Sequence, residues 1–81
     1  MAEKYKEAVA RIEQAKKEKS TTLDLHSLGL TTLPDQLLEL VHLKKLDLWD
    51  NQLTQLPEGM GKLSQLTELN LVRNQLSEFL F

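Results

Sequence analysis

Leucine returns at three fixed positions every 23 residues of this chain, and this repeat constrains the fold more than any other feature. The count starts at position 20 and gives three consecutive segments, residues 20–42, 43–65 and 66–81, the last one incomplete. The fourth, sixth and eleventh positions are leucine in all three: Leu23, Leu46 and Leu69; Leu25, Leu48 and Leu71; Leu30, Leu53 and Leu76. Such a period is typical of a solenoid, in which each repeat buries its apolar face against its neighbours.

The start of each segment predicts a strand, because apolar residues occupy every second position over residues 22–26, 45–49 and 68–72. We therefore expect an α/β fold with a short parallel sheet of three strands, whose leucines stack into columns. The return legs carry Leu-Pro followed by apolar residues at helical spacing. We expect a short helix in the first leg and a looser turn in the second, where Gly59 and Gly61 flank Met60.

Asparagine follows the strand at the ninth position of the second and third segments, as Asn51 and Asn74. Its amide can bond backbone groups of the turn and of the neighbouring coil. The first segment has Leu28 at this position. We therefore expect the ladder of amide contacts to start one repeat late.

Residues 2–19 predict an amphipathic helix whose apolar stripe consists of Ala2, Tyr5, Ala8, Val9, Ile12 and Ala15. A basic helix of this kind is also typical of membrane-surface or calmodulin-binding segments. We favour a cap, because a stack of repeats needs a cover for the apolar side of its first strand. The expected organisation is a capping helix over residues 1–19 and repeats over residues 20–81.

Composition excludes several classes of protein. The 81 residues include no cysteine and two histidines, which excludes a disulfide scaffold or a conventional zinc finger and favours a reducing compartment. Twelve acidic and ten basic side chains give a net charge of −2, so we expect no nucleic-acid partner. The longest apolar run is residues 79–81, which is far too short to cross a membrane, and we expect no membrane partner.

The repeat pattern L-x-x-L-x-L-x-x-N-x-L resembles leucine-rich repeat proteins, in the 23-residue subtype with an LPxxL leg. The helix with Ala8, Arg11, Ile12 and Ala15, running into LDLHSLGLTTLP, is similar to the start of the repeat region in bacterial Roco-type proteins. The resemblance implies a cytoplasmic, non-catalytic protein-binding module in signalling. The alternative is an N-terminal fragment of a longer Roco-like protein whose activity lies downstream, since no phosphate-binding GxxxxGK[ST] loop is present.

The resemblance also implies that a protein or peptide partner binds the open, concave face of the sheet. The side chains expected to contact it are Asp24, His26, Asp47, Trp49, Asp50, Asn70, Val72 and Arg73. Trp49 stands out, because exposed tryptophan is enriched in binding hot spots. The alternative is that its ring lies on the sheet beside His26 and Val72 without a partner.

Acidic side chains are expected on adjacent strands, and they allow two further interpretations. Asp24 and Asp47 repel each other and would attract a cation or a basic peptide, or they form a solvated ladder. His26 near Asp24, Asp47 and Asp50 can be drawn as a metal or acid–base site, but no serine nucleophile, glycine-rich loop or enclosed pocket accompanies them. We expect no enzyme activity, no cofactor and no metal.

The incomplete third segment leaves its outer leucines without a fourth repeat to pack against. We expect either that the tail Phe79-Leu80-Phe81 folds back over this side or that two copies associate through it. A two-fold homodimer is the favoured outcome.

Overall fold

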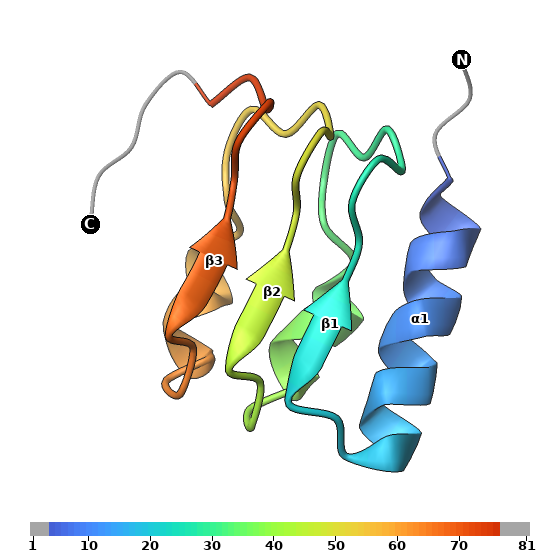
Figure 1. Cartoon of the computed structure of the whole chain (residues 1–81), viewed down its shortest axis with the longest axis vertical. Coiled ribbons are helices and arrows are strands. Elements are labelled where there is room, and N and C mark those ends of the chain that lie inside the picture. The colour runs from blue at the N-terminus through green and yellow to red at the C-terminus, as the bar shows by residue number, and fades with distance from the viewer. Residues whose placement is uncertain (1–3, 77–81) are drawn as a thin grey trace.

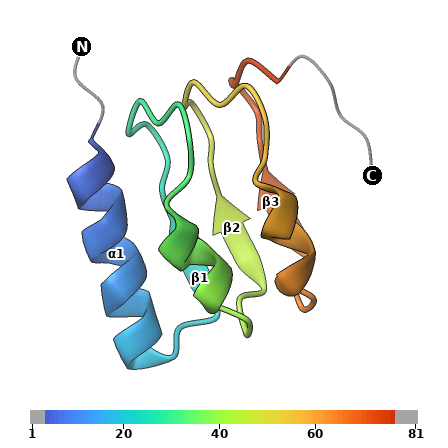
Figure 2. The same cartoon turned by 180° about the vertical axis from the view of Figure 1, so that it is seen from behind.

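The computed structural model describes residues 4–76 and arranges them as one helix beside a three-stranded sheet (Figure 1). Helix α1 spans Tyr5–Glu18. Strands β1, β2 and β3 span Thr22–Asp24, Lys45–Asp47 and Glu68–Asn70. Two 3-10 helices, η1 at Asp35–Glu39 and η2 at Glu58–Lys62, lie on one face of the sheet, which Figure 2 turns toward the viewer. No helix of residues 4–76 lies over the opposite face of the sheet (Figure 1).

The sheet is parallel, in the order β1-β2-β3, and its register follows the 23-residue period. Leu23 pairs with Leu46, and Leu46 pairs with Leu69. The predicted parallel strands and leucine columns are therefore confirmed.

Burial of the leucines decreases toward β3. In the column that continues from Leu25, Leu48 is fully buried, whereas Leu71 is only partly buried. Leu53 and Leu76 differ in the same way. The reason is that each repeat is covered by the next one, and no described strand lies beyond β3.

Helix α1 packs along β1 and η1 through one line of small and apolar side chains. Ala8, Ile12 and Ala15, spaced four and three residues apart, are buried. The expectation that Tyr5 belongs to this buried stripe is wrong, since its side chain is 39% exposed. Tyr5 is the first residue of the helix and lies one turn before the buried line starts. Residues 1–3, which were expected to belong to the capping helix, lie outside the described residues.

The helix ends at Lys19, whose backbone adopts a left-handed conformation with φ of 54°. Its N–H donates to the carbonyls of Ala15 and Lys16, and the N–H of Ser20 donates to the carbonyl of Ala15. This pattern closes the last helical turn and redirects the chain into β1.

Both return legs form the same short 3-10 helix, so the expected looser turn in the second leg is wrong. Pro34 and Pro57 precede these helices with almost equal backbone angles, and their carbonyls accept the N–H of Leu37 and Met60. The fixed proline φ and this hydrogen bond outweigh the weak helical preference of glycine.

An asparagine ladder joins the repeats, as expected. The Oδ1 atom of Asn51 accepts the N–H groups of Leu28 and Leu30, each at 3.1 Å. Its Nδ2 atom donates to the carbonyls of Leu25 and Leu48, each at 3.0 Å. Three of these four groups belong to the preceding repeat. The first repeat has no earlier repeat whose backbone an asparagine could bond. A buried leucine therefore suits position 28.

Candidate partner-binding face

The face of the sheet opposite the 3-10 helices carries polar side chains in a regular grid. Period-two alternation along each strand sends every second side chain to this face. Three of the resulting rows cross the sheet: Thr22, Lys45 and Glu68; Asp24, Asp47 and Asn70; His26, Trp49 and Val72. The first two rows and Val72 line a shallow open hollow. Sequence reasoning missed the first row, although the same alternation extended one step toward the N-terminus would have found it.

The strands end two residues earlier than expected, because the side chain of the last residue in each strand bonds the backbone N–H two residues later and so forms a turn. The Oδ1 atom of Asp47 accepts the backbone N–H of Trp49 at 3.0 Å. In β1, Asp24 does the same for His26 at 3.0 Å. Asn70 is the third example and accepts the N–H of Val72 at 3.0 Å. Each turn is followed by a residue with positive φ: Ser27, Asp50 and Arg73.

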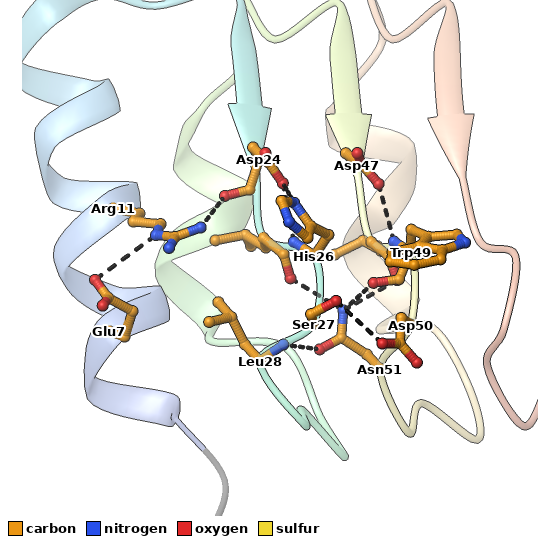
Figure 3. Close-up of polar contacts among 12 residues, drawn as sticks. Glu7, Arg11, Asp24, His26, Ser27, Leu28, Asp47, Trp49, Asp50 and Asn51 are labelled. Atoms are coloured by element: carbon orange, nitrogen blue, oxygen red, sulfur yellow. Dashed lines mark hydrogen bonds and ion pairs between the residues drawn. The ribbon is translucent and has the colours of Figure 1, made fainter.

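The carboxylate of Asp24 is the most strongly held of the face. It is bonded to the ring Nδ1 of His26 as well as to the backbone of that residue (Figure 3). Burial alone would raise the pKa of Asp24, but these hydrogen bonds and the charges of His26 and Arg11 outweigh it and hold the pKa below its usual value. Asp24 is therefore anionic at neutral pH.

The backbone of Asp24 also connects the face to the helix. The Nη1 atom of Arg11 donates to the carbonyl oxygen of Asp24 at 2.9 Å, and Glu7 lies 3.6 Å from the Nε atom of Arg11 (Figure 3). This contact fixes the end of β1 against α1.

Trp49 follows the middle strand β2 and lies between the imidazole of His26 and the guanidinium of Arg73. Its side chain is 36% exposed, its ring centroid is 6.2 Å from that of His26, and the Cζ atom of Arg73 is 5.7 Å from the Trp49 ring. Val72 beside it is 61% exposed. The structure thus brings together His26, Trp49, Val72 and Arg73, which sequence reasoning had assigned to the partner-binding set.

Asp50 and Arg73 belong to the turns after the strands rather than to the strand face proper. The Nε atom of Arg73 is 3.5 Å from the carboxylate of Asp50, and the hydroxyl of Ser27 donates to that carboxylate at 3.1 Å. Ser27 and Asp50 lie next to Trp49 in Figure 3, and Arg73 contacts both Asp50 and the Trp49 ring.

One group of side chains resembles a metal-ligating set. A carboxylate oxygen of Asp24, another of Asp47 and a ring nitrogen of His26 lie within 4.8 Å of one another. Hydrogen bonds to neighbouring groups account for the placement of all three side chains. The absence of a metal therefore stays a prediction.

The fold and the repeat geometry agree with a comparison to known families, in which the leucine rich repeat family matches residues 20–76. This chain belongs to the leucine-rich repeat family. Comparison with curated proteins gave no match. Leucine-rich repeat domains generally mediate protein–protein interactions and are typically non-catalytic, which agrees with the coarse expectation from sequence. Within residues 4–76, this leucine-rich repeat protein has no helix with the length and apolarity that a membrane crossing requires.

Proposed function

We propose that this protein is a non-catalytic interaction module that binds a protein or peptide partner on its open sheet face. The observation that carries the proposal is Trp49, a large aromatic side chain that directly follows the middle strand and stays partly exposed on a face that no other element of residues 4–76 covers. Aromatic residues in such central positions contribute a large share of binding energy at interfaces. The surrounding polar rows supply hydrogen-bonding groups for specificity.

The test compares two exposed aromatic side chains in binding. Peptides are first selected from a library of short random sequences on the immobilised wild-type protein, and their affinities are measured by calorimetry. Trp49→Ala is expected to weaken binding by about 2 kcal/mol or more, with little change in thermal stability. Tyr5→Ala is the matched control, since Tyr5 is 39% exposed on α1, away from the open face. Equal binding by wild type and Trp49→Ala would contradict the proposal.

The proposal has a second part, a two-fold homodimer through the outer side of β3. The leucines there are only partly buried: Leu66, Leu69, Leu71 and Leu76. Helix α1 lies at the other edge of the sheet, next to β1. A second copy therefore cannot add head to tail, and a closed pairing of β3 with β3 is the arrangement that covers both leucine surfaces.

Sedimentation equilibrium at micromolar concentration measures this directly, and we expect the mass of a dimer. A monodisperse monomer that melts cooperatively and binds no hydrophobic dye would contradict it. The alternative expectation, a folded-back tail over residues 79–81, lies outside the described residues.

The finer family assignment is also part of the proposal. It includes the LPxxL subtype, the likeness to Roco-type repeat regions, a cytoplasmic signalling role, and the division into a capping helix over residues 1–19 and repeats of a solenoid over residues 20–81. Leu-Pro before both η1 and η2 supports the subtype, with Met60 in place of the last leucine of LPxxL in the second leg. The genomic sequence around this chain tests the alternative, because an in-frame series of further 23-residue repeats would identify it as the N-terminal part of a longer protein.

A further inference from the structure

Two carboxylates lie side by side at the centre of the open face. Asp24 and Asp47 are direct partners in the parallel register of β1 and β2, and both side chains project from the open face. In each, Oδ1 accepts the turn hydrogen bond, while Oδ2 has no hydrogen bond or ion pair within residues 4–76. Like charges directly opposite in a sheet repel each other. Each carboxylate thus keeps one oxygen free to bond an incoming donor.

The other acidic side chains of the face already have basic partners. Lys45 Nζ is 3.6 Å from Glu68, and Arg73 Nε is 3.5 Å from Asp50. The cationic side chains are thereby paired with acids other than Asp47, which has no cationic partner among the described residues. The uncompensated negative charge of the face is therefore at Asp47, whereas Asp24 beside it is bonded to His26 through one oxygen and keeps the other free.

Trp49 adds a second attraction for cations next to this pair. It follows Asp47 by two residues on the same face, and its ring already accepts the guanidinium of Arg73 at 5.7 Å. An indole ring packs well against the alkyl stem of a long basic side chain while the charged end reaches a carboxylate.

We infer that the partner presents a lysine or arginine side chain on an extended segment, with its cationic end between Asp24 and Asp47 and its stem against Trp49. This inference rests on the proposed function and names the chemistry of its partner. Charge complementarity decides against an acidic or purely apolar partner at this face.

The third repeat supplies the substitution that tests the inference without disturbing the turn. Asn70 occupies the position of Asp47 and makes the same hydrogen bond to the N–H two residues later, at the same 3.0 Å. Asp47→Asn therefore keeps the turn and removes only the charge. Asn70→Asp is the reverse change and extends the pair to three carboxylates.

The probes are two capped peptides of alternating alanine and lysine or alanine and arginine, with a glutamine-for-cation peptide as the neutral reference. Trp49 is the only tryptophan, so its fluorescence reports binding at this face. We expect the basic peptides to bind wild type more tightly than the neutral one, and Asp47→Asn to bind them about three- to tenfold more weakly. Asn70→Asp is expected to bind them more tightly. Asp35→Asn in η1 is the matched control, with wild-type affinity and the same substitution off the face.

Three results would overturn the inference. One is equal affinity for the basic and neutral peptides, and another is an unchanged affinity in Asp47→Asn that melts like wild type. The third is binding that disappears with a chelator and returns with Zn²⁺, because the carboxylates and His26 would then hold a metal. If the library selection yields non-basic peptides whose binding still requires Trp49, the proposed function stands and this inference fails. If no selected peptide requires Trp49, both fail.

Discussion

At the residue scale, the buried asparagine of the second repeat explains how a chain with so small a core keeps its repeats in register. Asn51 is 5% exposed, and its amide bonds five backbone groups. No described buried side-chain nitrogen or oxygen lacks a partner. The single side chain thus replaces the hydrogen bonds that regular secondary structure would otherwise provide in the turn.

We predict that Asn51→Ala lowers the free energy of unfolding by about 3 kcal/mol or more, because it leaves several buried backbone groups unpaired. Asn74→Ala is the internal comparison. Asn74 makes three such bonds but is only partly buried, so water can replace them, and its loss is expected to be smaller. Urea denaturation of both variants measures the difference. Equal stability of Asn51→Ala and wild type would show that the ladder contributes nothing.

The roles of the repeated leucines and asparagines could be predicted from the sequence, because each of these repeat positions has one dominant role. The ninth-position asparagines and the leucine columns follow directly from the period. The early strand ends were not predicted, because the turn hydrogen bonds of Asp24 and Asp47 compete with the alternation of the strand. Apolar spacing alone carries no signal for that competition. The pairing of Arg73 with both Trp49 and Asp50 was also missed, because it depends on the positive φ of Arg73.

At the element scale, the contribution of α1 to the repeats can be read from its contacts. Ile12 is 1% exposed, and Lys16 Nζ lies 2.9 Å from Glu39 of η1. Arg11 donates to the backbone of Asp24 at the end of β1. The helix therefore contacts both legs of the first repeat. Its stripe was predicted from sequence, but the exposure of Tyr5 was not, because periodicity locates a face of a helix and not the length of its contact.

Removing residues 1–19 is predicted to unfold the remaining chain or make it aggregate. The deletion exposes one side of Leu23, Leu25 and Leu30, and each such side chain contributes about 1.5–3 kcal/mol when fully buried. A domain of this size has a total stability of about 5 kcal/mol. Circular dichroism during heating measures the outcome. A soluble 20–81 fragment that melts cooperatively would show that α1 is not a cap.

A point substitution tests how much the packing of α1 contributes to stability while the helix itself stays in place. Ile12→Ala keeps α1 but removes its largest buried side chain, and we expect a loss of about 2–5 kcal/mol. Glu13→Ala, at an exposed neighbouring position, is expected to change stability by less than about 0.5 kcal/mol. Equal melting temperatures of the two variants would show that the apolar stripe of α1 is not part of the core.

At the scale of the whole molecule, the two faces of the sheet have different roles. The 3-10 helices lie over one face, where the leucines are buried (Figures 1 and 2), and the polar rows beside Trp49 occupy the other face. The two sides of the sheet differ as well, because α1 covers β1 while the leucines near β3 stay partly exposed. The period sets the difference between the two faces, since every repeat presents the same residue types in the same directions. In the proposed function, the choice of partner depends on the few side chains of the open face that differ between repeats.

Binding at the open sheet face can be mapped by the changes in backbone amide chemical shifts when a selected peptide is added to the wild-type protein. We predict that the largest changes fall on residues 22–27, 45–50 and 68–73 and on the indole N–H of Trp49. Small changes are expected on α1, η1 and η2. Changes concentrated on α1 or on the 3-10 helices, with Trp49 unaffected, would contradict the claim that the open sheet face binds the partner.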